Sequence, residues 1–351
     1  MPIVTGSHFR RSLWSVLAAG ALSGPAVAIG VAQTDTSPPA ANAVPLAEPA
    51  AIIPEESVTD ATPDLMRLNA DMSDRMTMPV EIGAAGPYPF LIDTGSHRSI
   101  ISKELAARLA LMALPPVEII SMAGRATVPS VHLDQLSFGT QVVNDLPALI
   151  IAHSDLGSAG LIGLDSLRDK RLTLDFRKRQ MTIGKSSPSG LASHDRNTIV
   201  VQAKSKFGQL ILVNSKLDGK RVNVILDTGA DISVGNMALF NSLKQQKLVI
   251  PPRPVTLHAV TGQSVQAQFT VVRRLQIDFV NLENVPMVFL DAAPFAELDL
   301  ADKPSMLLGM KMLRMFERVA IDFGARHVDF QLPQGFNDEE TREKLRQFAS
   351  R

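Results

Sequence analysis

The sequence predicts an all-β protein built from two tandem lobes with a few short helices. Three observations carry this prediction. Apolar runs of strand length, bounded by Gly, Pro and polar residues, recur along the chain. One of them, FLIDTGSHRS at 90–99, has a nearly identical partner, VILDTGADIS, at 224–233. The order of elements around the first copy also repeats around the second, which indicates an internal duplication.

Composition allows about two domains and excludes several classes of function. The 351 residues carry 35 basic and 35 acidic side chains, 45% hydrophobic residues and no cysteine. A net charge of zero indicates neither a nucleic-acid-binding surface nor an acidic tail. Without cysteine, disulfides and thiolate chemistry are excluded, and a zinc site would need histidine and carboxylate ligands only.

The N-terminal residues 1–32 have the pattern of a secretory signal peptide. Arg10 and Arg11 precede an apolar segment at 13–31 that ends in small residues. The alternative is an uncleaved membrane anchor, because the apolar stretch is nearly long enough to span a bilayer. Both interpretations place the rest outside the cytoplasm, and we expect a periplasmic protein. Residues 33–74, rich in Ala, Pro, Thr and Ser, are expected to form a flexible linker.

The first lobe is expected over residues 75–185. A hairpin of 76–82 and 88–92 leads into Asp93, and Ser102 is placed to cap a helix over 103–112. A turn of small residues at 122–125 then joins two strand-like runs. The strand-like runs of this lobe after the helix are 118–121, 128–133, 149–152, 161–164, 172–176 and 180–184.

A Ser-, Pro- and Gly-rich link at 185–197 leads to the second lobe, expected over 198–333. There the hairpin 211–229 carries Asp227, and Asn236 is placed to cap a helix over 237–247. The counterparts of the later first-lobe elements are the turn 260–264 and the runs 306–310, 319–323 and 327–331. The charged tail 334–351 is expected to be an exposed helix or disordered.

The repeated Asp-Thr-Gly carries the chemistry. Asp93 and Asp227 each end an apolar strand, and a glycine two residues later suits a tight turn where the backbone comes close to another group. Two carboxyl groups held side by side cannot both ionise, so they share one proton. A water between them can lose a proton to one carboxylate while the other carboxyl donates to a carbonyl oxygen. This chemistry hydrolyses amides without a metal or a covalent intermediate.

On these paired motifs, and over roughly residues 75–332, the sequence resembles the retropepsin-like aspartic proteases, in a bacterial form with two domains on one chain. The resemblance implies two acid-protease β-barrel lobes that pair pseudo-symmetrically. It also implies an aspartic endopeptidase in which Asp93 and Asp227 are catalytic and no cofactor takes part. A polypeptide substrate would lie extended between the lobes beneath two flaps, bound through its backbone as an added strand.

The resemblance also assigns supporting roles. The hydroxyls of Thr94 and Thr228 are expected to interlock across the two loops and hold the aspartates coplanar. The expected active-site support consists of Thr94, Gly95, Ser96, Thr228, Gly229 and Ala230. The expected substrate-binding residues are His97 and Asp231 beside the motifs, and the flap-turn residues Ala123, Gly124, Thr261 and Gly262.

Two departures from the family pattern matter. The hydrophobic pair and glycine at 161–163 and 307–309 match the strand beneath the catalytic loop, but Leu164 and Met310 stand where the family often has a bracing arginine.

His97 occupies the place where the second copy has Asp231, so one end of a peptide would meet an imidazole and the other a carboxylate. An unperturbed imidazole is charged only below about pH 6.5.

Two alternatives remain open from the sequence. The chain could be a non-catalytic periplasmic peptide-binding module, or a protease in which each lobe pairs with its twin in a second chain. Asp-Thr-Gly is intact in both copies, which favours catalysis, and we expect a monomer. The histidines show no metal-ligand spacing, so we expect no metal site. We expect no nucleic-acid partner, and contact with a membrane only through the N-terminal segment.

Overall fold

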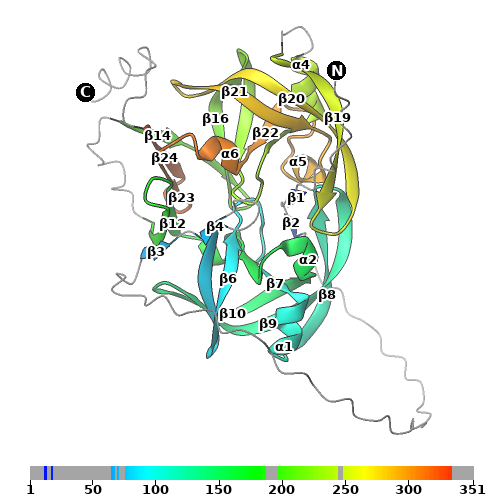
Figure 1. The fold of residues 1–351 in the computed structure, drawn as a ribbon, viewed down its shortest axis with the longest axis vertical. Helices are drawn as coiled ribbons and strands as arrows, with labels where there is room; N and C mark the ends of the chain where they lie inside the picture. The colour runs from blue at the N-terminus through cyan, green and yellow to red at the C-terminus, as the bar shows by residue number, and fades with distance from the viewer. Residues whose placement is uncertain are drawn as a thin grey trace, which may run out of the picture. The chain divides into compact units, whose positions relative to one another are not determined.

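The structure, a computed structural model, describes residues 76–186, 197–243 and 248–333 and the backbone of four short strands that precede them. These four are β1 (Ser12–Leu13), β2 (Leu17–Ala18), β3 (Leu65–Arg67) and β4 (Asn69–Ala70). The strands form two nine-stranded sheets and one six-stranded sheet, joined by a few short helices (Figure 1). The predicted all-β fold of two pseudo-symmetric lobes is confirmed.

The first lobe is one sheet with the strand order β2-β8-β9-β10-β7-β11-β6-β5-β4. The 15-residue β9 is long enough to pair with β8, β10 and β5, which curls the sheet around its apolar side chains. The bounds are β5 Met76–Ile82, β6 Ala85–Ile92, β7 Ile100–Ser102, β8 Ala113–Ser121, β9 Gly124–Phe138, β10 Gln141–Ile151 and β11 Gly160–Ile162.

Two helices lie between these strands, α1 (Lys103–Arg108) and α2 (His153–Leu156), and a third, α3 (Leu164–Leu167), follows β11. The Ser102 hydroxyl accepts the N–H of Leu105, as expected of an N-cap. The helix α1 is shorter than the sequence predicts, because Ala110 adopts a positive φ of 49° that ends the helical path.

The second lobe repeats this arrangement in the order β1-β19-β20-β21-β18-β22-β17-β16-β15. Its helix α4 (Met237–Ser242) begins after Asn236, whose side chain accepts the N–H of Leu239 as predicted. Its other helices are α5 (Ala293–Glu297) and α6 (Met310–Leu313). Its strands are β15 Lys204–Lys206, β16 Gln209–Leu217, β17 Lys220–Leu226, β18 Ser233–Gly235, β19 Ile250–Ala259, β20 Ser264–Ile277, β21 Val280–Phe289 and β22 Ser305–Leu308.

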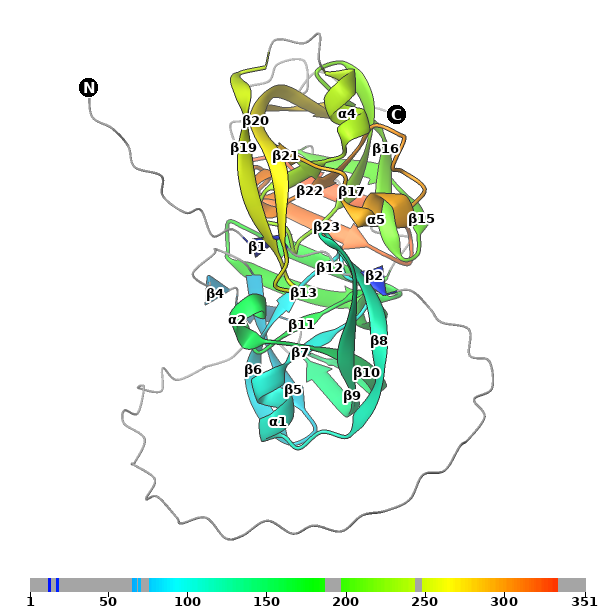
Figure 2. The same cartoon turned by 90° about the vertical axis from the view of Figure 1, so that its right-hand side faces the viewer.

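The third sheet joins the two halves, in the order β14-β24-β23-β12-β13-β3. Its strands β12 and β23 come from different halves and pair antiparallel, with Leu172 opposite Ile321 (Figure 2). One apolar cluster therefore contains side chains of both halves, among them Phe90 and Phe289. The bounds are β12 Lys170–Asp175, β13 Gln180–Lys185, β14 Thr198–Gln202, β23 Arg318–Asp322 and β24 His327–Gln331.

Some predicted segments differ from the structure, and others lie outside the residues that it describes. The strands β3 and β4 fall inside the predicted linker 33–74, so the end of that stretch is strand, paired with β13 and β5. The lobe boundaries 75–185 and 198–333 stay predictions, since β12 and β23 pair across them. Most of 1–32, most of the link 185–197 and the tail 334–351 lie outside the described residues. Within the described ranges, no helix is both long and apolar enough to cross a membrane.

Candidate active site

The two aspartates of the repeated motif stand at equivalent places in the two lobes. Asp93 follows β6 and Asp227 follows β17, and both residues are fully buried. The N–H of Asp93 donates to the carbonyl of Ile162 over 3.0 Å, and that of Asp227 to the carbonyl of Leu308 over 3.1 Å. Since β11 and β22 run parallel beside β6 and β17, each carboxyl is fixed at the end of a central strand.

Each carboxyl is oriented by two backbone N–H groups of its own loop. Oδ1 of Asp93 accepts from Gly95 over 2.7 Å and from Ser96 over 3.1 Å. Oδ1 of Asp227 accepts from Gly229 over 3.0 Å and from Ala230 over 3.1 Å. Oδ2 of Asp93 is buried and receives no hydrogen bond from an N–H or hydroxyl of the described residues. One oxygen of Asp93 is therefore held in place while the other is left for chemistry.

The two loops meet at these carboxyls. A β-carbon placed on Gly229 would stand 2.3 Å from Cγ of Asp93. Real β-carbons do not come this close to another atom, so a glycine is required here for the second loop to reach the first carboxyl. The sequence predicted this close approach from the glycine of the motif, and the structure identifies Asp93 as the group approached.

The environment of Asp93 favours its protonated form. Burial raises the pKa of this carboxyl well above its ordinary value of 3.8, and the negative charge of Asp227 raises the pKa further. The N–H groups of Gly95 and Ser96 act in the opposite direction, because they stabilise the carboxylate. The balance leaves Asp93 as a group that can hold a proton beside a second carboxyl.

Thr94 and Thr228 form the interlock that the resemblance implies. The hydroxyl of Thr94 donates to the carbonyl of Leu226 over 2.9 Å, and that of Thr228 donates to the carbonyl of Ile92 over 2.8 Å. Each hydroxyl also accepts the backbone N–H of the other threonine over 3.1 Å. Four buried hydrogen bonds thus join the two loops directly beside the carboxyls.

A pair of serines, Ser99 and Ser233, supports the two loops. The hydroxyl of Ser99 accepts the N–H of Gly163 over 3.1 Å, and that of Ser233 accepts the N–H of Gly309 over 3.2 Å. Both serines are buried. The signal was present in the sequence, because each serine stands six residues after its aspartate.

Two charged residues occupy the region where the family often has an arginine. Asp165 and Lys311 each lie two residues after the glycines of the β11 and β22 motifs. The carboxylate of Asp165 accepts the N–H and the hydroxyl of Ser99 over 2.8 and 2.7 Å, and burial raises its pKa. The ammonium of Lys311 lies 3.7 Å from Asp231. In the first lobe a carboxylate, Asp165, thus supports the loop after Asp93 through Ser99. In the second lobe an ammonium, Lys311, lies beside Asp231 instead. Neither contact uses the arginine of the family pattern.

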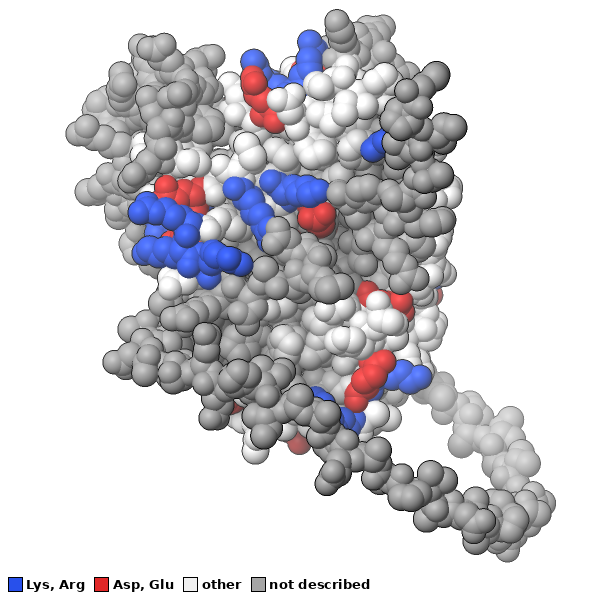
Figure 3. Space-filling model, viewed as in Figure 1, with Lys and Arg blue, Asp and Glu red and all other residues white. Residues whose placement is uncertain are grey.

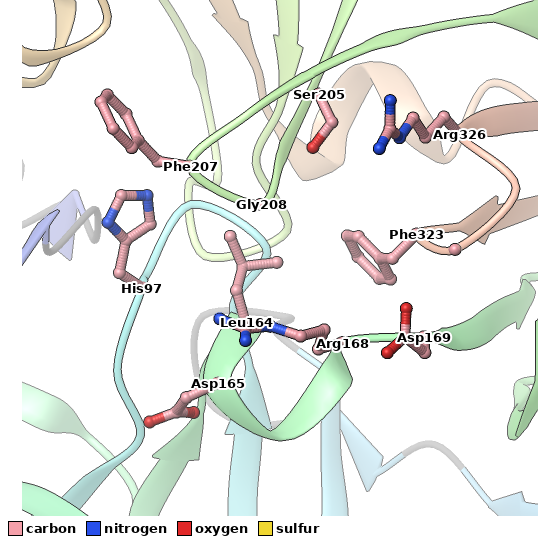
Figure 4. Close-up of a pocket in the computed structure, with 11 residues that line it drawn as sticks. His97, Leu164, Asp165, Arg168, Asp169, Ser205, Phe207, Gly208, Phe323 and Arg326 are labelled. Atoms are coloured by element: carbon pink, nitrogen blue, oxygen red, sulfur yellow. The ribbon is translucent and has the colours of Figure 1, made fainter.

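His97 lies in a cavity of about 520 Å³ that neither Asp93 nor Asp227 lines. Figure 4 shows its ring beside Phe207, with ring centroids 6.2 Å apart, while Asp165 points away from the cavity. Its Nε2 is buried and has no hydrogen-bond partner among the described residues. Burial lowers the pKa of His97 to about 4. Burial is thus the perturbation that keeps this imidazole neutral to a lower pH than an unperturbed one, and its contact with substrate stays a prediction.

The predicted flap turns close the β8–β9 and β19–β20 hairpins. Ala123 and Gly124 lie at the first tip, and Thr261 and Gly262 lie at the second, both glycines with positive φ. The hydroxyls of Ser121 and Thr261 are 3.3 Å apart, so the two tips touch each other. The substrate-binding role of the four flap-turn residues stays a prediction.

Each flap also contacts the opposite lobe. Met122 of the first flap is buried in an apolar cluster of second-lobe residues, and Val260 of the second flap is buried in an apolar cluster of the first lobe. The guanidinium of Arg125 in the first flap lies 3.1 Å from the carboxylate of Glu297 in α5. The structure therefore holds both flaps closed across the lobes.

Within the described ranges, no three His, Asp or Glu side chains gather as a metal site would require. On the face drawn in Figure 3, white residues predominate in the described part, and Lys and Arg lie beside Asp and Glu.

Comparisons with known proteins point to one group of families. Residues 78–169 match the family described as "gag-polyprotein putative aspartyl protease", and residues 213–312 match the family described as "Aspartyl protease". A search of curated proteins gave no match.

Among the solved structures that match, three have both low identity and a low TM-score. A retropepsin-like aspartic protease from Rickettsia conorii is 19% identical, covering 38% of this chain and 90% of that chain, with a TM-score of 0.27. Basic 7S globulin from soybean is 12% identical, covering 76% and 94%, with a TM-score of 0.40. The aspartic proteinase from Irpex lacteus is 11% identical, covering 79% and 99%, with a TM-score of 0.41.

Proposed function

The chain belongs to the retropepsin-like aspartic proteases, and from that premise we propose that it is an aspartic endopeptidase whose Asp93 and Asp227 act on one water. The observation that carries the proposal is the place of Asp93, buried in a site that the second Asp-Thr-Gly loop completes through Gly229. A module that only binds peptides would gain nothing from two buried carboxyl groups, since burying a charge costs free energy.

The proposed reaction follows from the surroundings of the Asp93 and Asp227 carboxyl groups. Asp93 holds the shared proton, because its pKa is raised by burial and by Asp227. The ionised Asp227 takes a proton from the water as the water oxygen attacks the peptide carbonyl, while Asp93 donates its proton to the carbonyl oxygen. Asp227 then passes the proton that it took from the water to the amide nitrogen, while Asp93 takes a proton back from a hydroxyl of the tetrahedral intermediate. The C–N bond breaks, one carboxylic acid and one amine leave, and the pair again holds one proton. The backbone N–H groups on each Oδ1 keep both carboxyls in place throughout.

Substrate binding would use the flaps. An extended peptide can pair its backbone with the first strand of each flap, as an added strand does at a sheet edge. The buried flap tips Met122 and Val260 would have to leave their clusters to admit it. Because closed flaps also exclude water from the site, we expect entry and release to require flap opening.

We further propose that the protein is exported and acts as a monomer outside the cytoplasm. The support is the basic and apolar pattern of residues 1–32, together with the hydrogen bonds that join Thr94 to Thr228 within one chain. Fractionation of cells that express the full chain would test the location. Recovery with the cytoplasmic fraction alone would contradict it.

The function is tested by incubating the purified full chain with casein, an unfolded protein, from about pH 4 to about pH 7. We expect new peptides from the wild type and none from Asp227→Asn. The exposed Asp302→Asn is the matched control and should cleave like the wild type. A folded wild-type preparation that leaves casein intact across this range would overturn the proposed function.

A further inference from the structure

The turn between β15 and β16 of the second lobe lies against the first lobe. The ring of Phe207 stands beside that of His97, with the ring centroids 6.2 Å apart (Figure 4). A β-carbon on Gly208 would lie 3.5 Å from Cδ1 of Leu164, which is an ordinary van der Waals distance. Leu164 stands where the family often has a bracing arginine. The second lobe therefore covers the place that the arginine would occupy.

Gln209, the first residue of β16, reaches the loop after Asp93. Its Nε2 donates to the carbonyl of Gly95 over 2.9 Å, and the two residues are 114 positions apart in the sequence. The side chain is buried, since the residue is only 2% exposed. Because a carbonyl oxygen only accepts, the carboxamide must present its N–H group to Gly95. The contact is thus a directed hydrogen bond from one lobe to the loop of the other.

The same peptide group also orients the Asp93 carboxyl. The carbonyl of Gly95 and the N–H of Ser96 belong to one peptide group, and this N–H donates to Oδ1 of Asp93 over 3.1 Å. Gln209 therefore holds one end of a peptide group whose other end holds Asp93. A peptide whose carbonyl accepts a hydrogen bond is polarised, which makes its N–H a stronger donor. The position and the donor strength of this N–H both depend on Gln209.

Stability alone gives little reason for a glutamine at this place. The Oε1 of Gln209 is buried and receives no hydrogen bond from the described residues. A buried polar atom without a donor costs free energy. A leucine would remove that cost at the expense of the bond to Gly95, so the two effects on stability oppose each other. The bond to Gly95 is what the glutamine adds.

We propose that Gln209 is a positioning residue for the aspartate pair: from the opposite lobe it fixes the peptide group between Gly95 and Ser96 and thereby sets the geometry and proton affinity of Asp93. The proposal rests on the proposed function and deepens it, since it names a residue that tunes one carboxyl of the pair. In this role Gln209 contacts neither the water nor the substrate. It acts through the loop that carries Asp93.

The proposal fixes the direction of the effect on Asp93. The N–H of Ser96 stabilises the carboxylate and so lowers the pKa of Asp93. Without Gln209 this N–H is a weaker and less well placed donor, so the pKa of Asp93 should rise further. The pair should then lose its shared proton at higher pH. The alkaline limb of the pH–rate profile should move to higher pH with it.

Other titratable groups near this peptide group are the same in the wild type and in variants at position 209. Asp227 is the charged group that raises the pKa of Asp93. The turn carries Lys206, which pairs with Asp299. The first lobe contributes His97 and Asp165 to the cavity beside the turn. A difference between the pH profiles of wild type and variant therefore reports the change at position 209.

The test uses two substitutions in the full chain and a matched pair of controls. Gln209→Leu removes the donor, whereas in Gln209→Glu the introduced carboxyl can donate to Gly95 only while it is protonated. Gln276→Leu and Gln276→Glu are the controls, because Nε2 of Gln276 also donates to a backbone carbonyl over 2.9 Å, that of Asp278.

Three measurements are made on each protein. The first is kcat and KM for casein from about pH 4 to about pH 8. The second is the melting temperature. The third is a carbon-13 titration of the Asp93 carboxyl, whose signal is assigned by its loss in Asp93→Asn. This titration needs no catalytic activity.

We expect Gln209→Leu to melt close to the wild type, to keep KM and to lose about tenfold to about a hundredfold in kcat. Its alkaline limb and the titration of Asp93 should both move to higher pH by about half a unit. Gln209→Glu should cleave well near pH 4 and lose activity as the introduced carboxyl ionises. Both Gln276 variants should follow the wild type.

Wild-type kcat and an unshifted alkaline limb in Gln209→Leu would overturn the positioning role. A loss of kcat that follows a loss of melting temperature, with the titration of Asp93 unchanged, would also overturn it and leave Gln209 a structural residue only. If the wild type leaves casein intact, the proposed function fails, and the carbon-13 titration still decides whether Gln209 acts on Asp93.

Discussion

Gly229 of the second Asp-Thr-Gly loop lies against the carboxyl group of Asp93 in the first, so close that a β-carbon on Gly229 would stand 2.3 Å from Asp93 Cγ. The contact links residues 136 positions apart and has no room for a methyl group. The place of the Asp93 carboxyl is therefore set by the backbone of the other loop.

Gly229→Ala should abolish cleavage of casein and lower the free energy of unfolding by about 1–3 kcal/mol, because the added methyl group must push the two loops apart. Gly184→Ala is the matched control, since a β-carbon there meets no atom within 4 Å. Activity assays and urea unfolding would measure both effects. Wild-type activity in Gly229→Ala would show that the two loops do not approach each other as described.

The threonine interlock predicts a loss of both stability and rate. Thr94→Val removes a hydroxyl that accepts the N–H of Thr228, and so leaves a buried donor without its partner. The cost should be about 1–3 kcal/mol of unfolding free energy, with a large fall in kcat for casein. Thr228→Val should behave in the same way.

Thr270→Val provides the comparison for this interlock. Thr270 is also buried, and its hydroxyl donates to the carbonyl of Ile250 in the same lobe rather than to a residue of either Asp-Thr-Gly loop. We expect this variant to lose stability while it retains kcat. If Thr94→Val and Thr228→Val melt and cleave like the wild type, the interlock has no energetic role.

The raised pKa of Asp93 predicts how stability depends on pH. In the unfolded chain Asp93 titrates near 3.8, whereas the folded protein keeps its proton to higher pH. The native state therefore binds more protons than the unfolded state between the two values, and stability falls as pH rises through this window. Asp93→Asn cannot ionise, so its melting temperature should rise relative to the wild type as pH increases from about 4 to about 8. Parallel melting curves for the two proteins would contradict the shift.

The lowered pKa of His97 predicts that stability changes with pH in the opposite direction, rising as pH rises. Burial lowers its pKa from 6.5 to about 4, so the unfolded chain binds more protons between these values. The contribution of neutral His97 is fully present above about pH 6.5 and is lost as pH falls towards 4. His97→Gln should therefore lose less stability than the wild type between pH 7 and pH 4.5, whereas the exposed His153→Gln should follow the wild type. An identical acid transition in His97→Gln and the wild type would exclude a buried neutral imidazole.

Local signals in the sequence were sufficient for the fold and for the placement of the aspartates. Strand-length apolar runs predicted β6 and β17, and the Asp-Thr-Gly repeats after them predicted the two carboxyls. The caps Ser102 and Asn236 predicted the starts of α1 and α4, because their effect reaches only three residues along the chain. The ends of these helices were harder to predict, since they depend on the path of the chain that follows.

Contacts between distant residues were beyond a single sequence. The shift in the pKa of His97 comes from burial among α3 and the β15–β16 turn, about which the motif DTGSH says nothing. The bond of Ser99 to Gly163 joins residues 64 positions apart, and only the matching position of Ser233 could have suggested it. The pairing of β1 and β2 with the flaps was equally hidden, because their sequence has the composition of a signal peptide.

The central claim is that Asp93 and Asp227 form one site within one chain. The most direct measurement is the rate of casein cleavage by Asp93→Asn, by Asp227→Asn and by an equimolar mixture of the two. A single shared pair predicts that each variant stays folded but cleaves at less than about a hundredth of the wild-type rate, and that mixing restores nothing. If either variant alone keeps about half of the wild-type rate, each lobe instead pairs with its twin in a second chain, and the shared pair is contradicted.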